Sequence, residues 1–342
     1  MGETKEDSAI AQLVTQSFGK ESEYRRAWLC LMSYAAHHPL GIHAPIILFT
    51  DNTSFFKQRL AGFNIEYILL TPEKIKTMRG EIDFLHRMKI ALIHEAFELH
   101  PGNILYADSD TFFIADPSSV SGQVANNRAF MHVHEYEFEY LKTIPLPAGE
   151  PFVAFYNLIT SKKILDAAGH EISISPKQSS WNAGVMFLHA SHHQLLPDVF
   201  ALTDQFYPDT RNHASEQYAF SLVLQNKTVL SACDNVIYHY WYRIKKVIVD
   251  DWLIGFEKEI EDQLTDDQIK EIKRWTGKLP TLLETHVLTL QDNAIQAFHE
   301  NQFAKGYRFA IKAFMKKPRD GKFLRDIAYH SRRAIKIKLG VA

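Results

Sequence analysis

The chain has 342 residues, of which 46% are hydrophobic and 23% charged, a composition that excludes a disordered or collagen-like chain. Its 38 basic and 40 acidic residues give a formal charge of −2, so no overall positive field is available to hold nucleic acid. Two cysteines, Cys30 and Cys233, are too few for a disulfide framework or a four-cysteine zinc site, and they indicate a reducing compartment, most simply the cytoplasm.

The first 113 residues alternate between short apolar runs and amphipathic helical patterns. Turn-forming residues bound each run, and this alternation predicts βαβ crossovers and a mostly parallel sheet. The predicted elements are strands at 10–15, 45–50, 65–70 and 103–107 and helices at 22–36, 55–60 and 81–99.

The pattern changes after residue 113. Residues 125–141 alternate like a strand, with His132 and His134 on one face. Mixed or antiparallel strands with helical cover are therefore expected to extend the first half. The predicted elements here are strands at 181–188, 229–232 and 236–239 and helices at 193–207 and 214–224.

The remainder of the chain, from about Trp252, predicts amphipathic helices. Residues 302–342 contain twelve Lys or Arg residues against two Asp, a net charge near +10, which leaves about −12 for residues 1–301. Such a segment forms either a solvated helical face or a surface that attracts the anionic headgroups of a membrane. No apolar run in the sequence approaches the roughly 18–20 residues of a membrane-spanning helix.

The clearest candidate site is Asp108-Ser109-Asp110, which directly follows the apolar run 103–107. Open α/β sheets bind ligands at the carboxyl ends of their strands. Two neighbouring carboxylates repel each other, and a divalent cation keeps both ionised while it also binds a diphosphate. The same residues would also suit an ordinary turn at the end of a strand.

Three weaker signals lie downstream. His239 ends a predicted strand, and an imidazole added to two carboxylates favours Mn²⁺ over an all-oxygen Mg²⁺ site, although a histidine packed among aromatic residues would look the same. Residues 182–184, Asn-Ala-Gly, enter a buried strand with small side chains that let the backbone approach a ligand. Glu216 and Gln217 begin a helix after Ser215, where an acid also suits the helix dipole.

The order and spacing of these motifs resemble a nucleotide-sugar glycosyltransferase of the GT-A fold, most like the retaining family 8 type. The resemblance covers about residues 10–246. It implies an α/β fold with a Rossmann-like mixed central sheet flanked by helices, followed here by a helical C-terminal extension. The catalytic domain would be 1–246, with a nucleotide half at about 10–113 and an acceptor half at about 114–246, and the basic helical extension would be 247–342.

The resemblance also implies roles for individual residues. Asp108, Asp110 and His239 would bind Mn²⁺ or Mg²⁺, and Trp181 and Trp241 would contact the acceptor. Glu216 and Gln217 would lie beside the anomeric carbon and, with Asp110, form the catalytic group. The donor-binding residues would be Thr15, Ser17, Arg87, Lys89, Asp108, Ser109, Asn182, Ala183, Gly184 and Lys245.

The sequence departs from the family's pattern in two places. Tyr242 stands where the family has a glycine three residues after the histidine, and Lys246-Val247 replaces the expected Pro-Trp. Glu216-Gln217 replaces the more usual Asp-Gln-Asp.

The implied reaction transfers a hexose from a nucleoside-diphosphate donor, most simply a UDP-sugar, to a hydroxyl of a carbohydrate or lipid-linked acceptor, with retention. We expect a cytoplasmic protein, peripheral on the inner membrane face if the basic segment 302–342 binds lipid.

Three alternatives stay open. A haloacid-dehalogenase-like phosphatase also carries Asp-x-Asp after an apolar strand, but its pattern wants Thr or Val where Phe112 stands, and places the motif on the first core strand. A non-catalytic sugar-binding module of the same fold would not need to retain both acids and His239. Separately, His132, His134 and Glu135 could bind Zn²⁺ instead of flanking an acceptor cleft or solvent.

Overall fold

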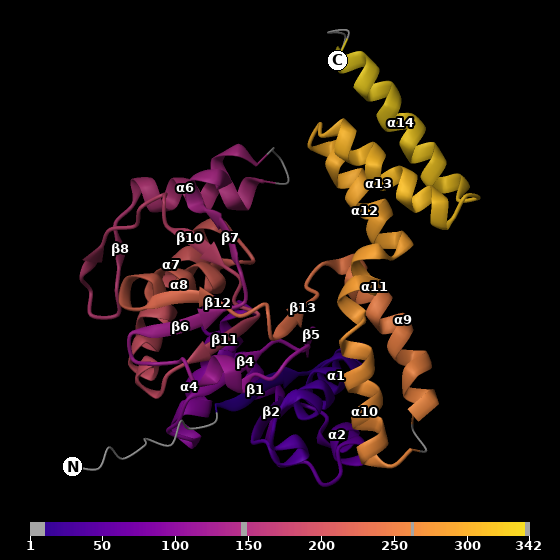
Figure 1. Cartoon of the computed structure of the whole chain (residues 1–342). Helices are drawn as coiled ribbons and strands as arrows, with labels where there is room; N and C mark the ends of the chain where they lie inside the picture. Colours follow the sequence, from indigo (N-terminus) through magenta and orange to yellow (C-terminus); the bar gives the residue numbers. More distant parts are fainter. Residues whose placement is uncertain (1–10, 145–148, 261–262, 339–342) are drawn as a thin grey trace, which may run out of the picture. The chain divides into compact units, whose positions relative to one another are not determined.

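The computed structural model describes residues 11–144, 149–260 and 263–338. Two compact units make up the chain, Met1–His239 and Tyr240–Ala342 (Figure 1). The division falls a few residues before residue 246, where the resemblance places the end of a catalytic domain, and that assignment stays a prediction. Residue 10 of the first predicted strand and residues 339–342 of the basic segment lie outside the described residues.

A seven-stranded mixed sheet forms the centre of the first unit, with strand order β12-β6-β11-β4-β1-β2-β3. Strands β4, β1, β2 and β3 are parallel, whereas β11 runs antiparallel between β4 and β6. The predicted mixed central sheet is therefore confirmed. Its strands are β1 (Gln12–Ser17), β2 (Ile46–Thr50), β3 (Ile65–Leu69), β4 (Ile104–Ala107), β6 (Arg128–Met131), β11 (Val185–Leu188) and β12 (Val229–Ala232).

Three two-stranded ladders lie beside this sheet, and all are antiparallel. They pair β5 (Thr111–Phe113) with β13 (Ile237–His239), β7 (His134–Glu137) with β10 (Ser179–Trp181), and β8 (Ile164–Leu165) with β9 (Glu171–Ile172).

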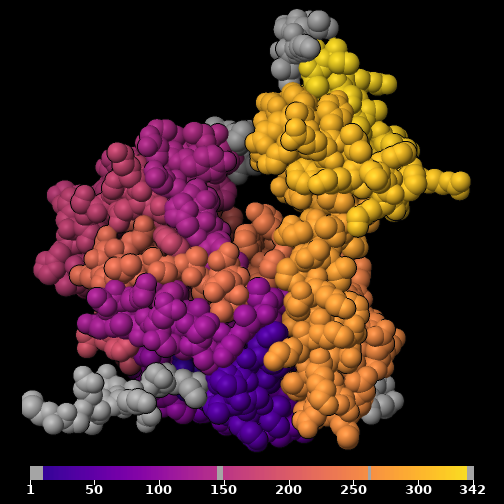
Figure 2. Space-filling model, in the orientation of Figure 1, coloured from indigo at the N-terminus to yellow at the C-terminus, as the bar shows by residue number. Residues whose placement is uncertain are grey.

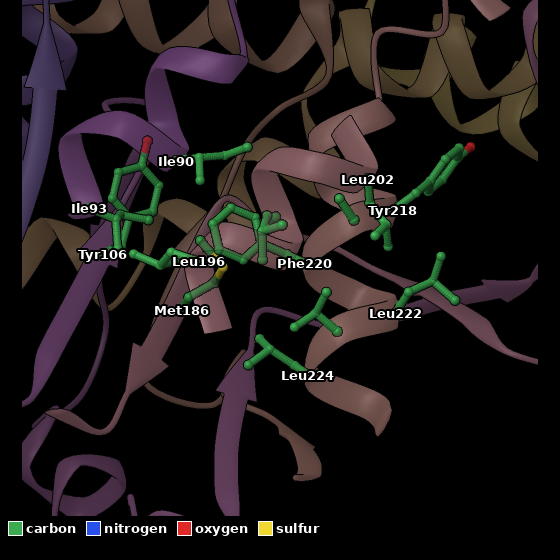
Figure 3. Close-up of a cluster of buried hydrophobic side chains, with 14 of the residues drawn as sticks. Ile90, Ile93, Tyr106, Met186, Leu196, Leu202, Tyr218, Phe220, Leu222 and Leu224 are labelled. Atoms are coloured by element: carbon green, nitrogen blue, oxygen red, sulfur yellow. The ribbon is translucent and has the colours of Figure 1, made fainter. Parts of the chain in front are cut away.

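Helices cover both faces of the sheet, because β2 and β4 are buried along their whole length and need cover on each side. On one face, apolar side chains of the sheet such as Tyr106 and Met186 pack with Ile90, Leu202 and Phe220 from the helices (Figure 3). The helices of this unit are α1 (Glu21–His37), α2 (Thr53–Arg59), α3 (Pro72–Arg79), α4 (Arg87–Leu99), α5 (Ser118–Ser121), α6 (Glu150–Ser161), α7 (Leu196–Thr210) and α8 (Ser215–Lys227), with short 3₁₀ helices at Gly41–His43, Phe138–Thr143 and Ala190–Leu195.

The predicted helix 81–99 is wrong over its first turn and a half. The helix α4 begins only at Arg87, because Gly80 and Asp83 adopt positive φ angles of 66° and 49°, which an α-helix cannot contain. Helix α3 precedes this break and was missed, although Thr71 caps it and Pro72 occupies its first turn.

The predicted strands 125–141 and 181–188 are each divided in two, and residues 138–141 of the first belong to a 3₁₀ helix instead. In the first, His132 and Val133 separate β6 from β7, so the side chains do not share one face. In the second, residues 182–184 separate β10 from β11, and these two strands belong to different sheets. The small residues of 182–184 allow this change of direction, which periodicity alone does not predict.

The second unit is helical in its described part, as the amphipathic pattern predicted. Helices α12 and α13 pack on each other, and Phe298 and Ala313 lie in their shared apolar cluster. No helix in the described residues has the length and apolarity needed to span a bilayer. The helices are α9 (Arg243–Ile260), α10 (Thr265–Thr276), α11 (Leu279–Thr285), α12 (Val287–His299), α13 (Phe303–Lys316) and α14 (Gly321–Lys338).

Candidate metal centre and active site

Two carboxylates and one imidazole meet just beyond the carboxyl end of β4. They belong to Asp108, Asp110 and His239, and one ligand atom from each lies within 4.8 Å of the others. His239 Nε2 lies 3.2 Å from Asp110 Oδ1, and both residues are buried, whereas Asp108 is half-buried. The three side chains are therefore close enough to hold one metal ion.

The ladder between β5 and β13 brings His239 to the two acids. In its register His239 pairs with Thr111, the residue directly after Asp110. The Thr111 hydroxyl donates a hydrogen bond to the main-chain carbonyl of Asp108 at 2.8 Å, which holds the turn between the two carboxylates. Two motifs that are far apart in the sequence thus become neighbours through strand pairing.

Asn182 sets the orientation of the His239 ring. Its Nδ2 donates to Glu135 Oε1 at 3.2 Å, so its Oδ1 is the atom that faces the Gly184 N–H at 3.1 Å and His239 Nδ1 at 2.9 Å. An amide oxygen only accepts, and this network therefore assigns the ring proton to Nδ1. Nε2 then faces Asp110, which is the orientation that a metal-binding histidine needs.

Gly184 makes room for the same ring. A Cβ at this position would lie 2.0 Å from Cε1 and 2.3 Å from Nδ1 of His239. Both distances are far inside van der Waals contact, so any larger residue would displace the imidazole. The small size of Gly184 therefore makes room for the His239 ring, in addition to allowing the change of strand direction at 182–184.

Lys89 is a buried cation between two carboxylates. Its Nζ lies 3.3 Å from Asp108 Oδ2 and 3.3 Å from Glu216 Oε1, and it donates to the carbonyl of Ala183 at 3.1 Å. Burial lowers the pKa of Lys89, but the two carboxylates more than offset burial and the net shift of this pKa is upward. Lys89 therefore stays protonated, and Glu216 Oε2 is buried with no hydrogen-bond partner among the described residues.

Tyr106 completes the surroundings of Asp108. Its hydroxyl donates to Asp108 Oδ1, and Gln16 Nε2 donates to that hydroxyl at 3.3 Å. Burial and the neighbouring Asp108 charge raise the pKa of Tyr106 well above its ordinary value, so the phenol keeps its proton. The sequence analysis placed Tyr106 in a buried strand and gave it no part in the site, because an apolar run predicts only burial.

Glu135 links Gln217 to Asn182 through hydrogen bonds. The sequence analysis did not assign it to this site. Its Oε2 accepts hydrogen bonds from Ser180 Oγ at 3.0 Å and Gln217 Nε2 at 2.8 Å, while Oε1 accepts from Asn182. Gln217 Oε1 in turn accepts from the Ala183 N–H at 3.3 Å. Glu135 thus ties Gln217 to the Asn-Ala-Gly segment, and its position in an alternating strand carried no signal of these partners.

Two hydroxyls at the carboxyl end of β1 are buried and have no hydrogen-bond partner among the described residues. They are Thr15 Oγ1 and Ser17 Oγ, which alternation places on one face of the strand. Buried polar groups in proteins are nearly always hydrogen-bonded, so a ligand or ordered water is expected to complete them. The donor contact predicted for Thr15 and Ser17 stays a prediction that these hydroxyls support.

Arg87 has other partners. Its guanidinium forms two hydrogen bonds with the Asp204 carboxylate, at 2.7 and 3.1 Å, and Gly80 leaves space for it. Lys89, two residues later, is the basic residue of α4 that contacts Asp108. The donor-binding role predicted for Arg87 stays untested by this arrangement.

Two more of the predicted residues lie in the first unit with contacts of their own. Ser109 Oγ donates to Glu23 Oε2 at 3.3 Å. The Trp181 ring packs edge-on against His134, with ring centroids 5.4 Å apart. Their predicted contacts with donor and acceptor stay predictions.

Lys245 and Trp241 belong to the second unit. Lys245 Nζ pairs with Glu284 Oε1 at 2.5 Å, and the Trp241 ring lies 5.0 Å from that of Tyr242. The predicted diphosphate contact of Lys245 and acceptor contact of Trp241 stay predictions.

The alternative zinc site at His132, His134 and Glu135 does not form a metal-binding group in the described part of the chain. His132 is buried, and its Nε2 lies 3.2 Å from the carbonyl of Ile237. Burial, with a further contribution from His239, lowers the pKa of His132 to about 3. His134 is exposed, so the two imidazoles face different surroundings.

The donor set of Asp108, Asp110 and His239 fits a divalent cation. Two carboxylates with one neutral imidazole suit Mn²⁺ and also accommodate Mg²⁺. The space at Gly184 and the hydrogen bond from His239 to Asn182 hold the imidazole with Nε2 toward Asp110.

No family model matches the sequence, and no curated protein sequence matches it. Three solved structures with a similar fold are glycosyltransferases. Mouse xyloside xylosyltransferase 1 in its apo form is 10% identical with a TM-score of 0.41, and the match covers 65% of this chain and 84% of that chain. The bifunctional glycosyltransferase WbbM is 13% identical with a TM-score of 0.42, over 65% and 38% of the two chains. GlyE of Streptococcus pneumoniae TIGR4 is 11% identical with a TM-score of 0.39, over 75% and 51%.

Proposed function

We propose that this chain is a metal-dependent glycosyltransferase that moves a hexose from a nucleoside-diphosphate donor, most simply a UDP-sugar, to a hydroxyl acceptor with retention. One observation carries the proposal. Asp108, Asp110 and His239 meet at the ligand-binding edge of an α/β sheet, beside the buried pair of Lys89 and Glu216.

The metal-binding group and Lys89 would act on the diphosphate. A divalent cation bound by Asp108, Asp110 and His239 would neutralise the diphosphate and stabilise its charge as it leaves. Lys89 holds Asp108 in place and adds a fixed positive charge in a buried site, where electrostatic stabilisation is strong.

Glu216 and Gln217 would act on the sugar. Glu216 Oε2 has no hydrogen-bond partner among the described residues, so it is available to a sugar hydroxyl or to the developing positive charge at the anomeric carbon. Gln217 is held by Glu135 and the Ala183 N–H, which fixes its amide beside the same segment.

Other residues would contact the base and ribose of the donor, the acceptor and the membrane. Thr15 and Ser17 offer two buried hydroxyls to the base and ribose of the donor. Trp181, on β10 beside Asn182, offers an aromatic face to a carbohydrate or lipid-linked acceptor. The basic segment 302–342 would bring the enzyme to an anionic membrane surface.

The test is a panel of nucleoside-diphosphate sugars assayed with Mn²⁺ and with Mg²⁺, with release of the nucleoside diphosphate as the readout. Asp110→Asn removes a charged ligand at constant volume and should reduce metal-dependent turnover by about 100-fold. Asp209→Asn is the matched control, since Asp209 is exposed and pairs only with the surface residue Lys162 in the described structure.

Two results would contradict the proposal. Wild-type protein that shows no thermal shift with any nucleoside diphosphate plus Mn²⁺ would argue against a donor site. Hydrolysis of small phosphomonoesters with Mg²⁺, without turnover of sugar nucleotides, would indicate the phosphatase instead.

A further inference from the structure

The second unit contains a cavity of about 780 Å³ that is lined by its own residues. The lining comes from α9, α10, α11, the start of α12 and the end of α13. Figure 2 shows the surface of this unit in orange to yellow. The volume is within the range of small-molecule sites, roughly 300–1,000 Å³.

The walls of this cavity are apolar and partly aromatic. Trp252 and Trp275 lie with ring centroids 5.6 Å apart, and Trp252 stacks on Phe256 at 4.6 Å. Leu283 is buried in the wall, whereas Leu282 is 46% exposed. Apolar walls open to water gain free energy when an apolar ligand displaces that water.

The lining also contains a few polar and charged residues, on α9, at the α11–α12 connection and on α13. They are Asp251, Thr285, His286 and Lys316. Burial lowers the pKa of His286, the Lys316 charge lowers it further, and Asp251 opposes both, so His286 lies near both charged residues and is neutral at neutral pH. Lys316 is exposed and continues the basic run of α13, which makes it the cation at the cavity.

We propose that this cavity binds a long-chain amphiphile with an anionic head. Its apolar chain lies against Trp252 and Trp275, and its head lies at Lys316. Chain length is recognised through burial of methylene groups, and the head is recognised through charge complementarity with Lys316. This proposal concerns residues of the second unit and does not depend on the transferase reaction.

The experiment titrates the full chain with bromostearate below its critical micelle concentration and follows tryptophan fluorescence. Bromine quenches indoles that it contacts, and two of the five tryptophans line the cavity. We expect saturable quenching with a stoichiometry near one. Trp252→Phe combined with Trp275→Phe should remove most of the quenching while calorimetry still detects binding.

Two pairs of exposed variants test the position of the ligand. Leu282→Glu places an anion in the wall and should weaken binding by about tenfold or more. Leu264→Glu, at a leucine that is 77% exposed outside the cavity, should leave it unchanged. Lys316→Glu should weaken binding by about fivefold, whereas Lys312→Glu, one turn away on α13 and not in the lining, should have little effect.

Three outcomes would overturn the proposal. The first is no saturable binding below the micelle concentration, which would show that the cavity does not bind the amphiphile. The second is binding that Leu282→Glu does not weaken. The third is equal affinity for bromostearyl alcohol, which has the same chain and no charge, because an anionic head would then play no part.

Discussion

Gly184 leaves room for the side chain of His239 because it has no Cβ. The His239 ring occupies the space where a Cβ of residue 184 would be, and Asn182 holds that ring through Nδ1. Both residues come from one short motif whose small size was visible in the sequence. Which side chain needed the space was not, because His239 arrives from a distant strand.

Gly184→Ala is therefore expected to weaken metal binding. The new methyl group would displace the His239 ring, so Mn²⁺ affinity measured by calorimetry should fall by about tenfold or more, and overpacking should cost about 1–3 kcal/mol of stability. Gly255→Ala is the control, because a Cβ there meets nothing within 4 Å. Unchanged Mn²⁺ affinity in Gly184→Ala would show that His239 is not a ligand.

Lys89 gives a second prediction at this scale. Lys89→Met keeps an unbranched apolar chain but removes the charged end, which leaves Glu216 buried without its cation, so the free energy of unfolding should fall by about 3 kcal/mol in urea denaturation. Lys142→Met removes a lysine from an exposed ion pair with Glu139 and should change stability little. Equal losses in the two variants would mean that the buried pair contributes no more than a surface pair.

At the scale of elements, the close approach of α12 and α13 depends on Gly306. This glycine faces Phe298, a buried residue at the centre of the second unit's apolar cluster. Helix propensity alone disfavours glycine here, so its presence reflects packing rather than helix formation.

Gly306→Ala should destabilise the second unit. Its Cβ would lie 2.5 Å from Cε1 of Phe298, and the strain should exceed the gain in helix propensity, with a net loss of about 1 kcal/mol in thermal unfolding. Gly321→Ala, at a position with nothing within 4 Å, is the control and should not lower the melting temperature. A higher melting temperature for Gly306→Ala would show that α12 and α13 can accommodate the methyl group without loss of stability.

At the scale of the whole molecule, residues 1–301 carry a net negative charge and residues 302–342 carry a net positive charge. The net of −2 hides a strongly basic segment at 302–342. In its described part this segment forms α13 and α14, and both carry exposed apolar residues among the basic ones. The most exposed are Ile311, Met315, Tyr329 and Ile335.

These helices are expected to bind anionic vesicles in a salt-sensitive way. Exposed apolar side chains would enter the interface while lysines meet the headgroups, each lysine contributing about 1 kcal/mol. Reversing Lys305, Lys312 and Lys322 to Glu should therefore weaken co-sedimentation with anionic vesicles by roughly 100-fold. The control reverses Lys57, Lys163 and Lys177, which are exposed in the first unit. Equal loss in both variants would indicate an effect of net charge alone.

The sequence by itself determined which elements exist in most of the chain, because periodicity and turn residues act locally. It also marked Asp108, Asp110, His239 and the Asn-Ala-Gly segment, since these residues stand at strand ends where ligands bind. It failed where local signals conflict, as in residues 81–86, where positive φ angles at Gly80 and Asp83 end a helical pattern.

Only the tertiary structure decided which side chains meet. The β5–β13 register brings His239 to Asp110, Lys89 lies between two carboxylates, and Glu135 joins Asn182 to Gln217. Each of these contacts joins distant segments, and their distances and protonation states follow from burial and packing that a linear pattern does not contain.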